Sequence, residues 1–466
     1  MTTLTHTTAT RPAGHPHRWD RPQVVHVERL PPRAAHPGEL ERPLPPAIRA
    51  RLPVEYLWRH QVAAIDLLRR GRSTVVASGT ASGKSLCYQL PVAEAVAADP
   101  PGTALALFPT KALAHDQLRA ISAPGYPGVV AGAYDGDCGP EERAWLRRHA
   151  NVVLTNPEML HHGILPSHTR WATFLHRLRY IVIDELHAIR GVFGSHVAHL
   201  LRRLQRLAAQ YGTAPTFAFS SATIGRPGTL ASSLCGHDVA EVVDDASPRG
   251  ERTFVLWNPN VVDDDREPSA RRDAATIVAE LVREGHRTIA FGRSRKVTEI
   301  LAAEIRRQLP PHLRPAVRSY RGGYLAAERR EIEQELADGH LLGVVATSAL
   351  ELGVDIGGLD ACVLVGFPGT IASMWQQAGR AGRGTQPSLT VLVAGDDQLD
   401  QWLMTHPREV FAGRAEPAVI DPRATPTCCS PNSPARPTNG RSGTTTAPGG
   451  PTPSTTASAT WSSPTR

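Results

Sequence analysis

The run of small residues from 78 to 85 (SGTASGKS) constrains the fold of this chain more than any other feature. It follows an apolar run at 75–77, which predicts a buried strand, and it precedes residues 86–97, whose pattern predicts a helix. A loop of this composition at a helix N-terminus lets backbone N–H groups surround phosphate oxygens. We therefore expect the following residues to bind a nucleotide: Ser78, Gly79, Thr80, Ala81, Ser82, Gly83, Lys84 and Ser85.

Lys84 and Ser85 carry the most specific part of this prediction. Lys84 would reach the β- and γ-phosphates, and the Ser85 hydroxyl would hold Mg²⁺. Only three of the 51 basic side chains are lysines, so a lysine here indicates a role that the planar guanidinium of arginine does not fill. An ordinary strand-to-helix connection is the alternative, because Ser78 and Ala81 stand where the strict pattern often has glycine.

Composition sets broad limits on the class of protein. A chain of 466 residues with 41% hydrophobic residues has room for roughly two to four domains. The net charge of +7 permits a polyanionic partner but does not demonstrate one. The six cysteines form no CxxC pair, and Cys428 and Cys429 are adjacent, so we expect a reduced, cytoplasmic protein without zinc. The sequence also predicts no membrane span and no signal peptide.

Short apolar runs alternate with helical patterns in two blocks, which predicts an α/β fold with two lobes, each built on a parallel sheet. The expected strands are 74–77, 104–108, 151–154, 180–183 and 216–219 in the first block, and 288–291, 343–346, 361–365 and 389–393 in the second. The predicted organisation is a loosely ordered lead-in (1–45), a first lobe (46–250), a linker (251–271), a second lobe (272–422) and a disordered tail (423–466). A cleft between two such lobes is a favoured ligand site.

Asp184 and Glu185 directly follow the expected strand 180–183. Polar side chains at the carboxyl end of a parallel strand lie on the ligand side of the sheet. Asp184 would hold Mg²⁺, and Glu185 would orient and deprotonate an attacking water. An exposed acidic turn is the alternative. Two hydroxyls after the next strand, Ser221 and Thr223, could hydrogen-bond this acidic pair.

Hydroxyl, amide and ammonium groups follow several other expected strands. Such donors suit contacts with a sugar–phosphate backbone, which position a strand without reading its sequence. As isolated turns these residues would be unremarkable. The candidate nucleic-acid contacts are Thr110, Lys111, Thr155, Asn156, Thr347 and Ser348.

The second block contains the segment QQAGRAGR, in which Arg380 and Arg383 are three residues apart. We expect them on one face at the start of a helix, where they would point across the cleft and stabilise transition-state charge. Asp355 would lie toward the nucleotide. Upstream of the phosphate loop, Gln61 would read the adenine edge through its paired donor and acceptor groups.

The order of these motifs across about residues 55–405 resembles the superfamily 2 DEAD/DEAH-type helicases. The resemblance implies two RecA-like lobes with ATP between them and single-stranded nucleic acid across both. It assigns adenine reading to Gln61, phosphate and Mg²⁺ binding to Lys84, Ser85 and Asp184, and catalysis to Glu185, Arg380 and Arg383. His187 and Gln376 match positions that usually couple the nucleotide to lobe closure.

Four further segments are similar to the mitomycin-repair-type (MrfA/YprA-like) DNA helicases: SGTASGKSLCYQLP, PTKALAHDQL, the turn at 134–137 (YDGD) and YRGGYLAAERREIE. That resemblance implies a 3′→5′ DNA translocase that acts in repair. Two alternatives stay open. One is an RNA helicase of the DExH type, and the other is a truncated nucleic-acid-binding ATPase that does not unwind.

The sequence departs from this family after Asp421 and Pro422, where members continue into a four-cysteine zinc domain. The Pro-, Thr- and Ser-rich residues 423–466 show no hydrophobic pattern. Our hypothesis is that they are an out-of-frame translation of a GC-rich gene, and a natural disordered tail is the alternative. The other two reading frames past codon 422 distinguish them, since one should encode a patterned, cysteine-bearing sequence.

Overall fold

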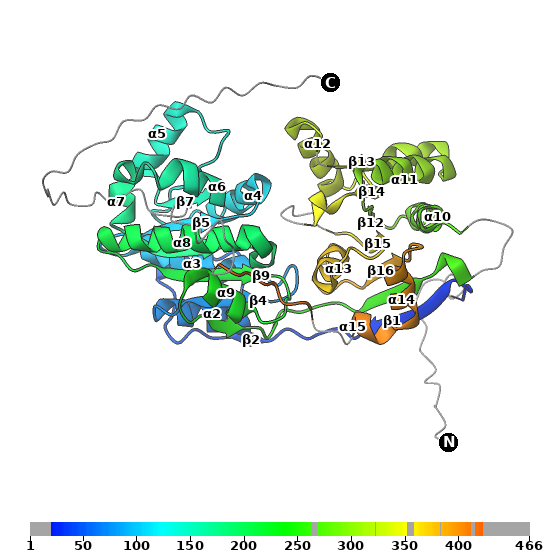
Figure 1. Ribbon diagram of the computed structural model, residues 1–466, viewed down its shortest axis with the longest axis horizontal. Coiled ribbons are helices and arrows are strands. Elements are labelled where there is room, and N and C mark those ends of the chain that lie inside the picture. Colours follow the sequence, from blue (N-terminus) through cyan, green and yellow to red (C-terminus); the bar gives the residue numbers. More distant parts are fainter. Residues whose placement is uncertain are drawn as a thin grey trace, which may run out of the picture.

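The computed structural model describes residues 20–261, 268–321, 323–351, 358–382, 384–411 and 415–422. It consists of two α/β lobes side by side, each built on a seven-stranded sheet (Figure 1). The predicted fold class is confirmed. The predictions for residues 1–19, 262–267 and 423–466, and for Asp355 and Arg383, fall outside the described residues.

The sheet of lobe 1 has the order β10-β4-β9-β8-β5-β7-β6, and all of its neighbouring strands are parallel. Its strands are β4 (Thr74–Ala77), β5 (Thr103–Leu107), β6 (Ala131–Ala133), β7 (Val152–Thr155), β8 (Leu178–Ile183), β9 (Thr216–Ser221) and β10 (Ala240–Val242). Its main helices are α2 (Arg59–Arg69), α3 (Lys84–Ala97), α4 (Lys111–Ser122), α5 (Pro140–His149), α8 (Gly191–Gln210) and α9 (Pro227–Cys235). Shorter elements of the same lobe are β2 (Pro37–Gly38), β3 (Leu57–Trp58), α1 (Pro46–Arg49), α6 (Pro157–Met159) and α7 (Ala172–Leu175).

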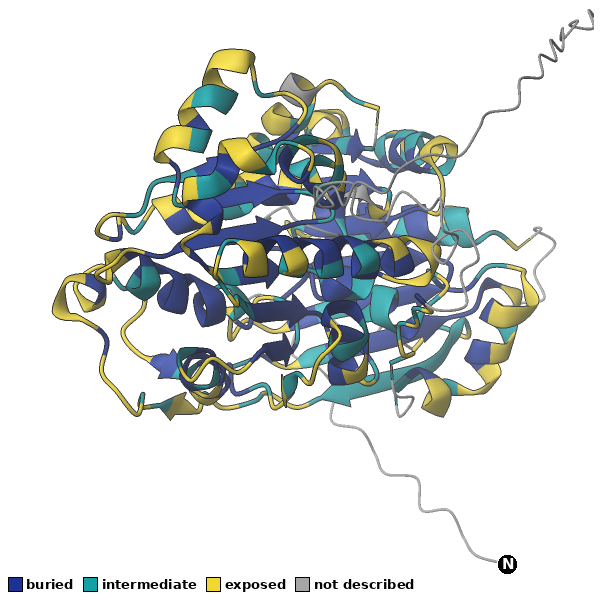
Figure 2. Ribbon diagram, turned by 60° about the vertical axis from the view of Figure 1, so that its left-hand side comes forward, coloured by how far each residue is buried: buried dark blue, intermediate teal, exposed yellow. Residues whose placement is uncertain are grey.

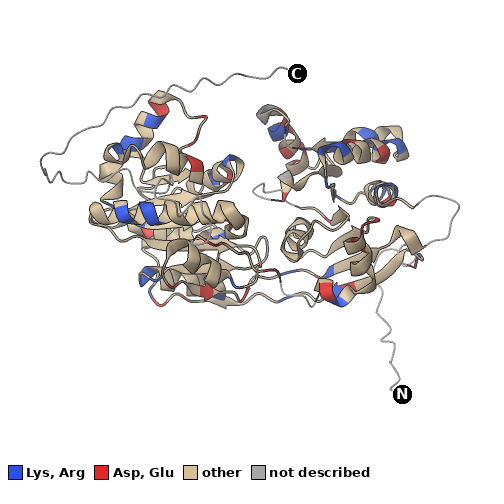
Figure 3. Ribbon diagram, in the orientation of Figure 1, with Lys and Arg blue, Asp and Glu red and all other residues tan. Residues whose placement is uncertain are grey.

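Helices cover both faces of this sheet, which explains why its strands are apolar without alternation. In β8, Ile181 and Ile183 pack in a cluster with residues of α8 such as Leu204. Val182, which points the other way, packs with Tyr88 of α3 and its neighbours. The central strands β4, β5, β7 and β9 are therefore almost wholly buried, the edge strand β10 is partly exposed, and most exposed residues lie on the outer helices and loops (Figure 2). Charged residues also lie mostly on the helices and loops (Figure 3).

The sheet of lobe 2 has the order β1-β11-β16-β15-β12-β14-β13. Its strands are β1 (Val24–Leu30), β11 (Arg252–Trp257), β12 (Thr288–Phe291), β13 (Val317–Tyr320), β14 (Gly343–Ala346), β15 (Ala361–Val365) and β16 (Ser388–Val393). Its helices are α10 (Ala270–Arg283), α11 (Arg295–Gln308), α12 (Ala326–Ala337), α13 (Ile371–Ala378), α14 (Gln398–Thr405) and α15 (Pro407–Phe411). All neighbouring strands are parallel except β1, which pairs antiparallel with β11.

Two predicted boundaries are wrong. Residues 24–30, placed in the loosely ordered lead-in, form β1, and residues 252–257, placed in the linker, form β11. The two strands are far apart in sequence and stabilise one another by pairing at the edge of lobe 2. Each strand pairs with a partner more than 200 residues away. The local alternation of strands and helices therefore does not predict either of them.

The chain therefore crosses between the lobes more than once. Residues 31–36 and 245–250 run side by side between them, joined by the reciprocal backbone hydrogen bonds of Arg33 and Arg249, of 2.8 and 3.0 Å. We call these two segments the interlobe ribbon. It continues directly into β1 and β11.

Residues 415–422 make a further connection, because they lie against lobe 1 although the preceding helix α15 belongs to lobe 2. Asp421 N–H donates to the Ser195 hydroxyl (3.1 Å), and Gly191 N–H donates to the Val419 carbonyl (2.8 Å). The Glu416 carboxylate accepts from Ile371 N–H at the start of α13 (2.9 Å). The C-terminal part of the predicted second lobe therefore packs on both lobes.

In the described residues, no helix is long and apolar enough to cross a membrane.

We expect Val27→Asp to destabilise lobe 2, because Val27 of β1 packs against its core and a carboxylate there would be partly buried without a partner. The expected loss is about 1–3 kcal/mol in the free energy of unfolding. Urea denaturation followed by circular dichroism measures it. The same change at Val192, which is 64% exposed, is the control and should have little effect. Equal stability of the two variants would show that β1 contributes nothing to lobe 2.

Candidate active site between the lobes

The predicted phosphate loop and the acidic pair meet residues of lobe 2 around one cavity. Its lobe 1 lining includes the loop from Thr80 to Ser85, Asp184 and Glu185. Four residues come from lobe 2: Glu351, Gln376, Gly379 and Arg380. The cavity is therefore shared between two units that are separate in the sequence.

The loop between β4 and α3 is held by hydrogen bonds among its own residues. The Lys84 ammonium donates to the carbonyls of Ser78 (3.1 Å) and Gly79 (2.6 Å). The Ser82 hydroxyl also donates to the Gly79 carbonyl (2.9 Å) and lies 2.6 Å from the Ser78 hydroxyl. The lysine thus rests on the loop itself, and these weak neutral acceptors would be exchanged for phosphate oxygens when a nucleotide binds.

Gly83 is required by the close approach of helix α2. Its φ of 75° lies in the left-handed region, and a Cβ atom there would be 2.4 Å from the Gln61 amide nitrogen. That nitrogen donates to the Gly83 carbonyl (2.9 Å), while the Gln61 amide oxygen accepts from Trp58 N–H (2.8 Å). Both groups expected to read adenine are therefore engaged. Gln61 is only 1% exposed and braces the phosphate loop from the first turn of α2, and adenine reading, which would need these bonds to be exchanged, stays a prediction.

Asp184 and Glu185 lie at the carboxyl end of β8, as the strand pattern predicted. An Asp184 oxygen accepts from Glu185 N–H (2.8 Å) and from the Ser220 hydroxyl. Glu185 has a φ of 51°, a left-handed conformation that is costly for a side chain with a Cβ. Such strain is typical of functional residues whose surroundings fix their direction.

Burial raises the pKa of Asp184 to about 6, and the neighbouring Glu185 charge adds to this shift. Burial also raises the pKa of Glu185, against the opposing effect of Lys84 and of Arg380 across the cleft. Two neighbouring carboxylates with little exposure to solvent are costly to ionise. Nearby cations or a bound divalent metal ion would lower that cost.

The predicted hydroxyl partners of the acidic pair are shifted by one residue. Ser220 donates to Asp184, whereas the Ser221 hydroxyl finds no hydrogen-bond partner among the described residues and Thr223 is exposed. Successive residues of a strand point to opposite faces, so only one of two adjacent serines in β9 can reach the end of β8. Tyr88 was not predicted, and its hydroxyl lies 3.4 Å from the Asp184 carboxylate.

Two hydrogen bonds join the lobes at the cavity. The Gln376 amide nitrogen of α13 donates to Nε2 of His187 (2.7 Å). Burial lowers the pKa of His187 to about 4, so the ring is neutral and can accept this bond. The Thr80 hydroxyl donates to the Gly379 carbonyl (3.1 Å), and a Cβ at Gly379 would lie only 2.1 Å from that hydroxyl. The structure therefore brings together the pair predicted to couple the lobes.

Arg380 reaches the same cavity, although its predicted setting is wrong. Helix α13 ends at Ala378, so Arg380 follows a helix instead of opening one. Gly379 follows as the C-terminal cap and ends the helical pattern. Burial lowers the pKa of Arg380, and the Glu185 and Glu351 carboxylates oppose this shift. Its guanidinium donates to the Glu351 carbonyl.

The candidate nucleic-acid contacts divide into two groups. Thr155 is 1% exposed and donates to the Tyr134 carbonyl (2.6 Å), so its hydroxyl supports the fold and the predicted contact is wrong. Thr110 and Asn156 cap the helices α4 and α6 by accepting from backbone N–H groups, which leaves their own donors for other partners. Lys111 forms an exposed ion pair with Asp137 (2.8 Å), which is weak enough to exchange for a phosphate.

Two further candidates, Thr347 and Ser348, follow strand β14 of lobe 2. Ser348 is exposed and Thr347 is half-buried. The ends of β5, β7 and β14 therefore carry the remaining predicted contacts on both lobes.

The residues present fit Mg²⁺ bound together with a nucleotide. Mg²⁺ prefers oxygen ligands and usually takes only one or two from the protein, with phosphates and water completing its shell. Ser85 and Asp184 supply a hydroxyl and a carboxylate at one wall of the cavity. Among the described residues, no cluster of three or more His, Cys, Asp or Glu side chains could hold a metal alone.

Comparison with known proteins gives two family matches. Residues 58–229 match the DEAD/DEAH box helicase model, and residues 273–385 match the helicase conserved C-terminal domain. The chain is 44% identical over 414 residues to the uncharacterized ATP-dependent helicase YprA of Bacillus subtilis, covering 86% of this chain and 54% of YprA. It is 40% identical over 403 residues to the ATP-dependent helicase HRQ1 of Saccharomyces cerevisiae, covering 84% of this chain and 37% of HRQ1.

Among solved structures, the chain likewise resembles helicases. The structure of the DUF1998 helicase MrfA bound to DNA and AMPPNP has a TM-score of 0.82 and 43% identity, covering 86% of this chain and 57% of that one. The helicase Lhr of Mycobacterium smegmatis bound to ssDNA and AMP-PNP has a TM-score of 0.62 and 29% identity, covering 78% and 49%. The chain thus spans about half the length of YprA and MrfA, and less of HRQ1.

The contact between His187 and Gln376 predicts non-additive variants. His187→Ala or Gln376→Ala alone should each lower ATP turnover by about tenfold, since each removes the same hydrogen bond between the lobes. The double variant should be no slower than the slower single one. Gln334→Ala, which removes an exposed hydrogen bond within α12, is the control. Additive losses measured by phosphate release would show that the two side chains act separately.

Proposed function

The chain belongs to the DEAD/DEAH-box helicases of superfamily 2, of the MrfA/YprA type, and from its divided site we propose that it hydrolyses ATP to move along DNA. The observation that carries this proposal is the cavity itself. Lobe 1 contributes Lys84, Asp184 and Glu185, and lobe 2 contributes Gln376 and Arg380. A site completed only when two lobes meet links the state of the nucleotide to the arrangement of the lobes.

Each group has a defined place in the reaction. Lys84 leaves the Ser78 and Gly79 carbonyls for the β- and γ-phosphates. Ser85 and Asp184 would hold Mg²⁺, which neutralises phosphate charge when bound. Glu185 orients the attacking water and accepts its proton, and Arg380 stabilises the charge that develops on the transferred phosphoryl group. Asp355 and Arg383 stay predictions of additional nucleotide contacts.

We assign the nucleic-acid substrate to DNA. Support comes from the structures of MrfA bound to DNA, with and without AMPPNP. The exposed donors at the ends of β5, β7 and β14 lie on both lobes, so one strand of nucleic acid could contact the two together. Movement in the 3′→5′ direction, duplex unwinding and a role in DNA repair belong to this proposal.

Two other functions remain alternatives. RNA presents the same phosphate backbone as DNA. The assignment to DNA therefore rests on the similar proteins and not on particular residues of this chain. The chain also spans about half of YprA and MrfA, so a translocating ATPase that does not unwind is compatible with the same site. We also propose a reducing, cytoplasmic compartment, because the four cysteines of the described residues are free thiols and three are buried.

The roles of Lys84 and Glu185 are separable by substitution. Lys84→Ala should abolish ATP turnover by weakening nucleotide binding. Glu185→Gln should retain binding of ATP and lower turnover by roughly 10²–10⁴-fold, since the amide cannot accept the proton of water. Equilibrium binding of a fluorescent ATP analogue and phosphate release measure the two steps. Normal turnover by Glu185→Gln would contradict the assignment of the base.

The substrate is tested with the full chain and single-stranded oligonucleotides of matched length. DNA should stimulate ATP turnover more than RNA does, and duplexes with a 3′ single-stranded extension should be displaced in preference to those with a 5′ one. Stimulation by RNA alone would favour the RNA helicase. Stimulation by DNA without displacement of either duplex would favour the ATPase that does not unwind.

A further inference from the structure

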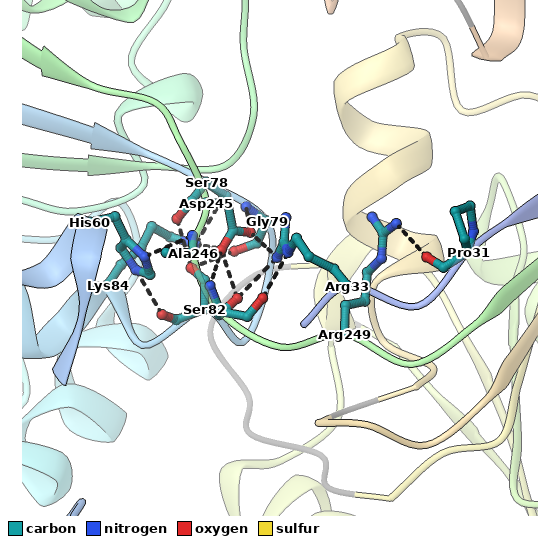
Figure 4. Close-up of polar contacts among 11 residues, drawn as sticks. Pro31, Arg33, His60, Ser78, Gly79, Ser82, Lys84, Asp245, Ala246 and Arg249 are labelled. Atoms are coloured by element: carbon teal, nitrogen blue, oxygen red, sulfur yellow. Dashed lines mark hydrogen bonds and ion pairs between the residues drawn. The ribbon is translucent and has the colours of Figure 1, made fainter. Parts of the chain in front are cut away.

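The interlobe ribbon is attached to the phosphate loop (Figure 4). One carboxylate oxygen of Asp245 accepts from Gly79 N–H (3.3 Å) and forms an ion pair with Arg33 (2.8 Å). Asp245 belongs to one segment of the ribbon and Arg33 to the other. A single oxygen atom therefore ties both segments to the second residue of the loop.

A second connection reaches the other end of the loop through His60. Ala246 N–H donates to Nδ1 of His60 (3.2 Å), so Nε2 carries the proton and donates to the Ser82 carbonyl (3.0 Å). The ring is held in one neutral tautomer between two backbone groups. The ribbon thus binds the loop at Gly79 and, through His60, at Ser82.

The charge of Asp245 is well supported by its surroundings. Its other oxygen accepts from the backbone N–H (3.0 Å) and hydroxyl (2.6 Å) of Ser247. Burial raises the pKa of Asp245, but the hydrogen bonds from Ser247 and Arg33 outweigh it, so the pKa lies below its ordinary value. The Asp245 side chain is 13% exposed, which separates this ion pair from the weak pairs of an open surface.

Gly79 connects this contact to the catalytic lysine. Its N–H is bound by Asp245, and its carbonyl accepts from Lys84 (2.6 Å). Lys84 also donates to the Ser78 carbonyl (3.1 Å), which belongs to the same peptide group as the Gly79 N–H, so a shift of the ribbon would move a group on which Lys84 rests. The ribbon continues into β1 and β11 of lobe 2, so a rotation of lobe 2 would change the position of its segments.

We propose that Asp245 and Arg33 are positioning residues that make the conformation of the phosphate loop depend on the arrangement of the two lobes. This inference rests on the proposed ATPase activity. A change in the arrangement of the lobes would move the ribbon and Gly79, and so would change how readily Lys84 leaves the Ser78 and Gly79 carbonyls for the phosphates. The pair touches no substrate, and it acts through the loop backbone.

The test compares ATP turnover with and without single-stranded DNA. Asp245→Asn and Arg33→Gln each remove the ion pair, and each should lower the ratio of stimulated to basal turnover by about fivefold or more. Arg33 also donates to the Ser247 carbonyl within the ribbon (2.7 Å), so the double variant should lower the ratio no further than Arg33→Gln alone, because the ion pair is already lost. Arg33→Lys, which keeps the charge, should recover part of the ratio.

Arg21→Gln is the matched control. Arg21 also lies in the N-terminal segment and forms a half-buried ion pair, with Glu280 (3.0 Å), but that pair touches lobe 2 alone. Its ratio should equal that of the unchanged protein. If Asp245 and Arg33 merely stabilise the fold, basal and stimulated turnover fall together, the ratio is unchanged and the inference is overturned.

The failure of this inference differs from failure of the proposed function. An unchanged protein that hydrolyses no ATP, or that DNA does not stimulate, contradicts the proposed function. A DNA-stimulated ATPase whose ratio survives Arg33→Gln contradicts only the positioning role. Thermal unfolding of each variant identifies any loss of fold, and Arg33→Gln keeps the test valid if Asp245→Asn does not fold.

Discussion

Two neighbouring carboxylates at the interlobe cavity need nearby cations. Lobe 1 places the buried Asp184 beside the half-buried Glu185, and of the cations that act on Glu185, Lys84 comes from lobe 1 and Arg380 from lobe 2. Neither lobe alone matches its carboxylates with cations, so the site favours the arrangement in which both lobes contribute. The hydrogen bonds from Gln376 to His187 and from Thr80 to Gly379 then fix how the lobes meet.

Much of the fold follows from local sequence. Strands β4, β12, β14 and β15 have the bounds that the apolar runs predicted, because a strand covered on both faces is apolar at every position and ends where polar residues begin. The same reasoning places Lys84 and the acidic pair, since residues that follow parallel strands meet at one edge of a sheet. These predictions need no knowledge of distant partners.

The predictions that failed all depend on partners far away in sequence. β1 and β11 pair with each other across more than 200 residues, so neither strand is predicted from its own surroundings in the sequence. Thr155 is buried beneath the turn that follows Tyr134, and the choice between Ser220 and Ser221 depends on which face of β9 meets Asp184. Asp245 shows no motif at all, and only its contact with Gly79 distinguishes it from other acidic residues.

The interlobe ribbon and residues 415–422 have a mechanical consequence for the pair of lobes. In Figure 1 the connections between the lobes lie below α4 and α12, which stand nearer the upper side of the molecule. If the lobes move relative to one another, these connections would confine the motion largely to a rotation about the side on which they lie. Displacement grows with distance from the axis of a rotation, so a small change near Gly79 would accompany a larger separation of α4 and α12.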